Sequence, residues 1–239
     1  MKFWVEHDDL DTHTVLQNLK LLKGLNIEPC YSLIPPKLND EQQLKKRFSF
    51  LTDNKEYVVL HPHPQWTYKQ WTREAWIEIG LYLHQQGIRL VFSGGASQEE
   101  IEYVAYIASK LPEDSINLAG QLKLTELSLV IAGAKLYLGP DTGITHLAAA
   151  TGIPVIALYG PTNPVKWGPW PFAYDQNVNP FNRIGSQQVG NIYLIQGQGD
   201  CVPCHLEGCD RHQQSRSVCL DSLSSEVIKA VIVQIVGAK

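Results

Sequence analysis

One continuous stretch, residues 136–163, constrains the fold of this chain more than any other. Its pattern is typical of a buried strand, a tight polar turn, a short helix of small residues and a second buried strand. The turn Asp141-Thr142-Gly143 lies where the first strand ends and the helix begins. A helix start leaves about four amide N–H groups without internal partners and carries roughly half a positive charge. Because a glycine there admits close approach, the pattern predicts a phosphorylated ligand at residues 141–146.

Strands and helices alternate over most of the chain. The expected strands are 57–61, 89–92, 115–118, 136–139, 154–158 and 191–195, and the expected helices are three capped by Thr72, Ser97 and Ser224 and one over 125–132. Strands that are apolar on both faces and alternate with helices predict an α/β fold, a doubly wound Rossmann-like parallel sheet. With strand order 3-2-1-4-5-6, a crevice opens between the first and fourth strands at their carboxyl ends. The loops 61–71 and 140–146 follow those strands and are expected to share one ligand site.

Five residues near this crevice are candidates for ligand binding. Lys69 can neutralise a pyrophosphate, with a solvated surface lysine as the alternative. Asp141 either caps the helix or serves the ligand, and both roles are compatible. Thr142 and Gly143 are expected to present their amides along the helix axis. His146, one turn further, can donate to a phosphate or sugar hydroxyl, or pack as a core residue.

The second expected helix contains a further candidate, Glu99. A carboxylate here can accept hydrogen bonds from ribose hydroxyls, although acids early in a helix also simply favour its dipole. The segment Ser93-Gly94-Gly95 is not a dinucleotide fingerprint, since no Gly-x-Gly-x-x-Gly follows the first strand. A Rossmann oxidoreductase is therefore the weakest of the functional hypotheses.

Charge and hydropathy exclude several classes of protein. The net charge of −4 gives no basic field that would favour nucleic acid. Residues 1–10 contain acids where a secretory signal needs an apolar core. No apolar run approaches the ~18 residues of a transmembrane helix. We therefore expect a cytoplasmic protein, with peripheral attachment at the inner membrane face as an open alternative.

Four of the five cysteines, Cys201, Cys204, Cys209 and Cys219, lie in one short segment. Their spacing is compatible with a tetrahedral thiolate site for zinc or iron, in which His205 and His212 could substitute as ligands. Buried free thiols and oxidised pairs are the alternatives.

Several motifs resemble one known family. The stretch Gly139-Pro-Asp-Thr-Gly-Ile-Thr-His146 and its continuation to Pro164 closely resemble the signature of the heptosyltransferases, glycosyltransferase family nine. The segments 58–62 leading into 69–71, 117–120 followed by Leu124, and the cysteine cluster fit the same family. The resemblance covers essentially the whole chain, and the long signature is specific.

The resemblance implies a fold and a function. The family has the GT-B fold of two facing Rossmann-like domains, of which the carboxyl-terminal one binds a nucleotide sugar, typically ADP-heptose, for assembly of the lipopolysaccharide core. Transfer in the family inverts the anomeric centre and needs no catalytic metal or other cofactor. Carried over by position, the residues expected to bind the donor are Asp141, Thr142, Gly143 and His146 at the diphosphate and sugar, Lys69 at the phosphates or sugar, Glu99 at the ribose, and Leu122 against the base.

The resemblance also predicts the organisation of the chain. Residues 1–50 look like the family's helical interdomain segment, and they contain a helical apolar stripe, which we call the leucine stripe, of Val15, Leu16, Leu19, Leu22 and Leu25. Residues 51–239 then form the nucleotide-sugar-binding domain, including a cysteine-containing loop, 201–219, and a carboxyl-terminal helix. The acceptor-binding domain and its general base are expected in a missing amino-terminal half. A stand-alone nucleotide-sugar-binding module without turnover is the alternative function.

Overall fold

The structure, a computed structural model, describes residues 9–237 and centres on one sheet. The expectation that the first ten residues form no secretory signal rests largely on residues outside that range. The strands, in order of sequence, are β1 Tyr57–Leu60, β2 Arg89–Phe92, β3 Ile116–Asn117, β4 Leu136–Pro140, β5 Val155–Tyr159, β6 Gln187–Val189 and β7 Ile192–Gln196. They lie side by side in the order β3-β2-β1-β4-β5-β7-β6.

The predicted sheet topology is confirmed. All neighbouring strands run parallel except β6 and β7, which pair antiparallel. The six expected strands take the expected order, so β1 and β4 are neighbours, with Leu60 opposite Leu138. The sequence gives no apolar signal for β6, because Gln187 and Gln188 are polar and this strand lies at the edge of the sheet.

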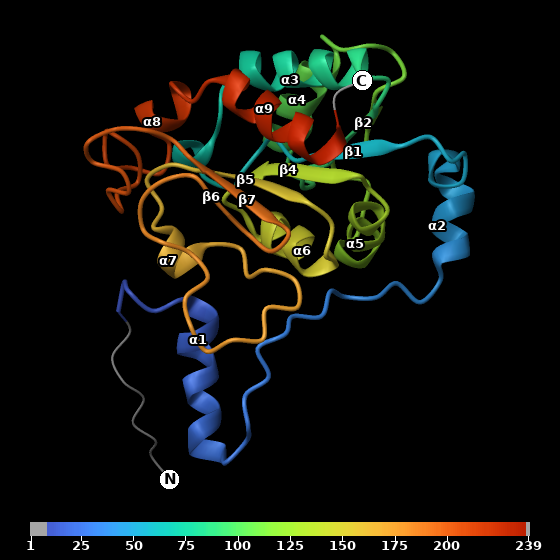
Figure 1. Ribbon diagram of the computed structural model, residues 1–239. Helices are drawn as coiled ribbons and strands as arrows, with labels where there is room; N and C mark the ends of the chain where they lie inside the picture. The colour runs from blue at the N-terminus through green and yellow to red at the C-terminus, as the bar shows by residue number, and fades with distance from the viewer. Residues whose placement is uncertain (1–8, 238–239) are drawn as a thin grey trace.

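Helices cover both faces of the sheet (Figure 1). On one face lie α3 Arg73–Gln85, α4 Gln98–Ala108 and α9 Ser225–Val236, and on the other lie α5 Leu124–Ala132 and α6 Gly143–Thr151. The predicted caps are confirmed, since the side chains of Thr72, Ser97 and Ser224 each accept from an amide of the first turn. These capping bonds satisfy amides that would otherwise lack a partner at the helix start.

Each layer of helices encloses its own apolar core. One core joins α3, α4 and α9 to side chains of the sheet such as Leu60 and Leu138. The other joins α5 and α6 to the opposite face, including Val59 and Tyr137. Within β1, β4 and β5 every residue is buried, which is why their sequences are apolar without alternation.

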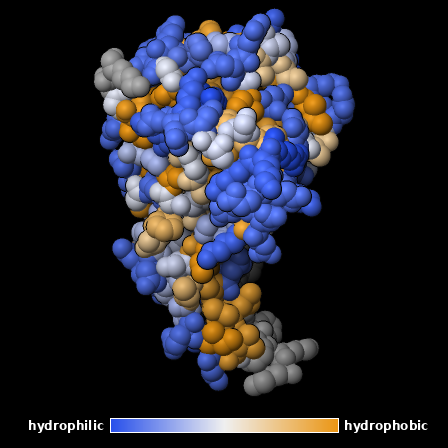
Figure 2. All heavy atoms as spheres, turned by 90° about the vertical axis from the view of Figure 1, so that its right-hand side faces the viewer, coloured by the Kyte–Doolittle hydropathy of each residue, from blue (hydrophilic) through white to orange (hydrophobic). Residues whose placement is uncertain are grey.

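The amino-terminal part extends away from the sheet (Figure 1). It contains α1 Thr14–Leu19, the 3-10 helix η1 Lys20–Leu25, α2 Glu41–Arg47 and the 3-10 turn η2 Ser49–Leu51. Of the predicted stripe, Leu16 is buried but Leu25 is 60% exposed, and Leu21 and Ile27, outside the stripe, are also more than half exposed. The predicted leucine stripe therefore only partly meets apolar partners, and Figure 2 shows apolar surface on this protrusion.

His13 fastens α1 to the loop after β5. Its Nδ1 accepts from the amide of Val15, and its Nε2 lies 2.7 Å from the carbonyl oxygen of Gly168, to which it donates. Only a neutral imidazole can do both. Burial is the largest cause that lowers the pKa of His13, from 6.5 to about 4.

This histidine predicts a loss of stability in acid. Because the folded-state pKa is depressed, the unfolded chain binds the proton more readily, and stability falls as the pH drops from 6.5 towards 4. At ~1.4 kcal/mol per pKa unit, the loss approaches about 3 kcal/mol. Urea unfolding should show a clearly shallower pH dependence in this window for His13→Gln. An identical dependence in the variant and the wild type would contradict this role of His13.

Candidate functional site

The loops after β1 and β4 meet at the carboxyl edge of the sheet. Lys69 ends the 3-10 turn η3 Thr67–Lys69, and its Nζ lies 2.6 Å from Oδ2 of Asp141. The Lys69 side chain is 20% exposed and the Asp141 side chain 7%. This ion pair places the lysine beside the turn that opens α6, as the predicted topology requires.

Asp141 is not the cap of α6. Thr142 is the N-cap residue, and its hydroxyl accepts from the amide of Thr145 at 3.4 Å. The capping alternative for Asp141 is therefore wrong, because Thr142 takes that place. The Asp141 carboxylate instead faces Lys69 and accepts from the Tyr159 hydroxyl at 3.3 Å. This leaves the carboxylate facing across the crevice.

The amino end of α6 is open to an approaching anion. Gly143 is exposed, and a β-carbon placed on it would meet nothing within 4 Å among the described residues. Its backbone lies outside the left-handed region, so local conformation does not demand glycine here. The glycine leaves free space beside the positive end of a nine-residue helix.

His146 lies one turn further along α6 and is partly buried. Burial lowers its pKa, against the attraction of Asp141 and with the repulsion of Lys69. A neutral imidazole next to the Lys69–Asp141 pair can still donate one hydrogen bond. The position of His146 is compatible with ligand contact and with packing as a core residue.

Two cavities flank this ion pair. One, of about 290 Å³, is lined by Thr142, Gly143 and Leu122 together with His61, His63 and Glu100. The other, of about 380 Å³, is lined by Lys69 and Asp141 together with Tyr68, Asn163, Trp167 and His205. The arrangement can hold an elongated ligand with its anionic part beside α6 and a portion in each cavity.

Glu99 lies apart from these two cavities. Its side chain is 73% exposed, and its Oε1 lies 3.9 Å from Nε2 of His63, beside a neighbouring hollow that Arg73 also lines. Glu100 is the carboxylate that reaches the smaller cavity, where Oε2 accepts from the amide of Gly95. Glu100 directly follows the candidate Glu99, so the acidic pair at the start of α4 was the available signal.

His61 and His63 were not singled out from the sequence, yet both line the smaller cavity. Nδ1 of His61 lies 3.0 Å from the Ser93 hydroxyl, and burial is the largest cause that lowers the pKa of His61 to about 4. The motif His61-Pro-His63 directly after β1 was the available signal. Histidines that directly follow a strand at the switch point are candidates for ligand contact, because ligands bind at the carboxyl ends of these strands.

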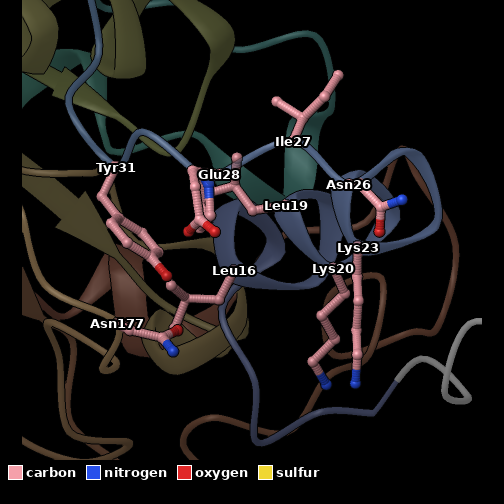
Figure 3. Close-up of a pocket in the computed structure, with 10 residues that line it drawn as sticks. Leu16, Leu19, Lys20, Lys23, Asn26, Ile27, Glu28, Tyr31 and Asn177 are labelled. Carbon is pink, nitrogen blue, oxygen red and sulfur yellow. The ribbon is translucent and has the colours of Figure 1, made fainter.

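A further cavity, of about 400 Å³, lies against α1 and η1 (Figure 3). Leu16, Leu19 and Ile27 supply apolar lining, and the carboxylate of Glu28 and the Tyr31 ring face it from the following segment. Its residues include none of the candidates for ligand binding, so it does not belong to the crevice.

The cysteines are free thiols in this structure. Burial, together with the neighbouring Cys204 and Cys209, raises the pKa of Cys219 to about 11. Across residues 9–237, no three His, Cys, Asp or Glu side chains gather so as to hold a metal ion. Nε2 of His205 lies 2.9 Å from Nη2 of Arg183, so this ring nitrogen faces a cation and is not free to bind a metal ion. The alternative of buried free thiols fits Cys219, whereas Cys201 and Cys209 are exposed and Cys204 is half-buried.

Within residues 9–237, no helix is both long enough and apolar enough to cross a membrane.

Fold and crevice together define a Rossmann-like α/β domain with the open amino end of α6 at a topological switch point. Residues 2–191 match the model of glycosyltransferase family 9 (heptosyltransferase), and the chain belongs to this family. It is 31% identical, over 162 residues, to lipopolysaccharide heptosyltransferase 3 of Escherichia coli. That match covers 66% of this chain but 47% of the relative, so the chain spans about half of that protein.

Solved structures show the same fold. The E. coli heptosyltransferase WaaC with ADP has a TM-score of 0.64 at 23% identity, covering 98% of this chain and 59% of that one. A family 9 glycosyltransferase from Veillonella parvula has a TM-score of 0.71 at 18% identity, covering 99% and 63%. Membership of a glycosyltransferase family favours sugar transfer over the oxidoreductase hypothesis.

Proposed function

We propose that this chain is the donor-binding half of an inverting heptosyltransferase. Residues 51–239 bind a nucleotide-diphosphate sugar, ADP-heptose, and residues 1–50 form the segment that leads to an acceptor-binding domain. The acceptor is a lipopolysaccharide core or a related glycan. The observation that carries the proposal is the meeting of Lys69 with Asp141 beside the open amino end of α6.

The chemistry follows from where charge develops. As the bond from the anomeric carbon to the phosphate oxygen breaks, negative charge grows on the leaving nucleoside diphosphate. The amides of Thr142 and Gly143, the dipole of α6 and the Lys69 ammonium can stabilise that charge. The supply of positive charge by these groups supports a transfer that needs no catalytic metal.

Each remaining candidate has a role in this proposal. Leu122 packs against the base in the smaller cavity. Glu99, whose carboxylate lies outside that cavity and 3.9 Å from Nε2 of His63, accepts from the ribose hydroxyls. Asp141 and His146 face the sugar, whose hydroxyls can donate to the carboxylate. The larger cavity, which Lys69 and Asp141 both line, has space for the sugar.

Thermal unfolding in the presence of ADP-, UDP- and GDP-sugars tests this proposal. A ligand at ~100 times its dissociation constant adds ~2.7 kcal/mol of stability. We expect ADP-heptose to raise the unfolding temperature most. No shift with any ADP compound at millimolar concentration would contradict the proposed function.

Gly143→Ala is predicted to weaken donor binding without weakening the fold. The added methyl has room among the described residues, and alanine favours the helix by up to ~1 kcal/mol. It nevertheless fills space through which a phosphate would approach the amides. Calorimetry should show at least ~tenfold weaker ADP binding, equivalent to ~1.4 kcal/mol, with an unchanged or higher unfolding temperature. Equal affinity would place the phosphate elsewhere.

A further inference from the structure

His63 is a buried polar residue in the wall of the proposed nucleotide cavity. It is 5% exposed, lies edge-on to the Tyr103 ring and lines the smaller cavity together with Thr142 and Gly143. Within residues 9–237 its Nδ1 atom is buried and has no hydrogen-bond partner. A buried polar nitrogen without a partner is unfavourable, so a bound molecule that supplies one would be favoured.

The other ring nitrogen of His63 faces Gln70. Nε2 of His63 lies 3.0 Å from Nε2 of Gln70, and both side chains are buried. An amide nitrogen donates and does not accept, so Nε2 of His63 must be the acceptor. In a neutral imidazole the single proton then lies on Nδ1, which makes the unpartnered nitrogen a donor.

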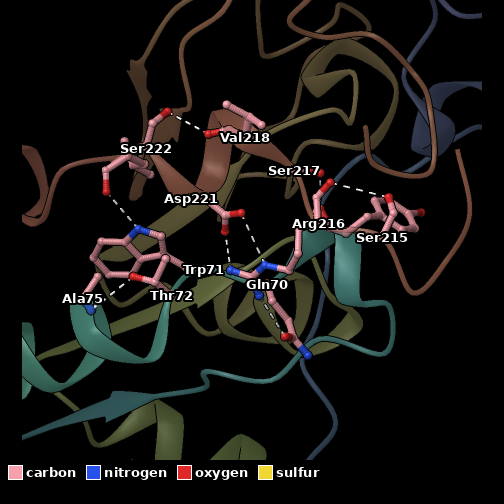
Figure 4. Close-up of polar contacts among 12 residues, drawn as sticks. Gln70, Trp71, Thr72, Ala75, Ser215, Arg216, Ser217, Val218, Asp221 and Ser222 are labelled. Carbon is pink, nitrogen blue, oxygen red and sulfur yellow. Dashed lines mark hydrogen bonds and ion pairs between the residues drawn. The ribbon is translucent and has the colours of Figure 1, made fainter. Parts of the chain in front are cut away.

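The orientation of the Gln70 amide is itself fixed. Nη1 of Arg216 donates to Oε1 of Gln70 at 3.2 Å, and a guanidinium has no acceptor that would allow the opposite orientation (Figure 4). Asp221 holds Arg216 in turn, with Nε of Arg216 3.4 Å from Oδ2 of Asp221 (Figure 4). A chain of donors and acceptors thus runs from Asp221 to the ring of His63.

Further hydrogen bonds hold the same loop in place. Ser217 donates its hydroxyl to the carbonyl of Tyr68 at 2.6 Å, and Trp71 donates its indole N–H to the carbonyl of Leu223 at 2.9 Å. The segment after the cysteine cluster therefore braces the loop that bears both His63 and Lys69.

His63 is uncharged in this environment. Burial is the largest influence and lowers its pKa, although the carboxylates of Glu100 and Glu99 act in the opposite direction. Arg73 lowers the pKa as well. The neutral ring carries one proton, and the hydrogen bond from Gln70 to Nε2 places this proton on Nδ1.

We propose that His63 donates its Nδ1–H to an acceptor oxygen of the bound nucleoside diphosphate, and that Gln70, Arg216 and Asp221 are positioning residues that fix the required tautomer. The proposal rests on the proposed function, since it names a further donor in the same site.

Nitrogen-15 NMR of the histidine side chains tests the tautomer in the full chain without ligand. We expect His63 to carry its proton on Nδ1, and Gln70→Leu to move a large part of the population to the Nε2–H form. A wild-type ring protonated on Nε2 would overturn the proposal, because Nδ1 would then be an acceptor facing an anion.

Calorimetry with ADP tests the contact itself. We expect His63→Phe to weaken ADP binding at least ~tenfold, as for one hydrogen bond to a charged acceptor. His63→Asn should retain most of the affinity, because its amide N–H₂ lies near the position of Nδ1. The matched control is His84→Phe, at a surface histidine of α3 beside Asp114, which should bind ADP like the wild type.

The two proposals fail differently. If the wild type does not bind ADP, the proposed function fails. If the wild type binds ADP and His63→Phe binds it equally well, the donor-binding function stands and the role of His63 is overturned.

Discussion

Replacing Lys69 with alanine is expected to lower the rate of sugar transfer by about a hundredfold in the complete enzyme. The removal of one preorganised donor that stabilises transition-state charge typically costs ~3 kcal/mol. Lys69 faces the α6 turn from the opposite loop. In the proposed function, alanine would therefore leave the departing diphosphate without its ammonium partner. Steady-state kinetics with ADP-heptose should show the loss mainly in kcat. Thr142→Ala is expected to show a loss of the same order.

The buried partner of Lys69 requires its own control. Lys69→Ala leaves the Asp141 carboxylate without its cation, which could weaken folding as well as catalysis. The double variant Lys69→Met/Asp141→Asn removes both charges and should fold, yet transfer should remain slow. The matched control is Lys135→Ala, at the residue directly before β4. This variant loses a surface ion pair with Glu56 and should retain full activity. Wild-type turnover in both Lys69→Ala and Thr142→Ala would refute the placement of the diphosphate.

Trp76→Ala is expected to cost more stability than any other single change considered. Trp76 lies in α3 with its side chain fully buried, and its ring meets that of Trp71 edge-on with 5.4 Å between the ring centroids. Removal of a buried tryptophan leaves a cavity and typically costs 3–5 kcal/mol, so a loss of about 4 kcal/mol is expected in urea unfolding. Leu81→Ala on the same helix is the matched control, because Leu81 is 41% exposed and should change stability little. A loss below about 1 kcal/mol for Trp76→Ala would contradict the packing.

The elements of the fold could be predicted where their signals are local. Apolar runs and capping residues such as Thr72 and Ser224 define strands and helix starts from a few neighbouring residues. Leu124 and Val227 are apolar residues of α5 and α9, yet they are 56% and 44% exposed. Both lie in the first turn of their helix, and the local apolar pattern does not indicate which residues of that turn meet a neighbouring element.

The proximity of Lys69 to the α6 turn could also be predicted, because a parallel sheet with β1 beside β4 brings their following loops together. The cap at Thr142 could not, since Asp141 and Thr142 are both good capping residues and only the backbone path distinguishes them. The environment of His63 depends on Gln70 and on Arg216, which lies 146 residues further along the chain than Gln70. A pattern of neighbouring residues in the sequence therefore does not predict the contact between Gln70 and Arg216.

Amide NMR of the chain titrated with ADP tests the central claim most directly. The largest chemical-shift changes are expected at the backbone amides of Thr142, Gly143 and Ile144, with smaller changes around Lys69. Saturable ADP binding that leaves these amides unchanged would contradict the account, because the diphosphate would then bind elsewhere on the protein.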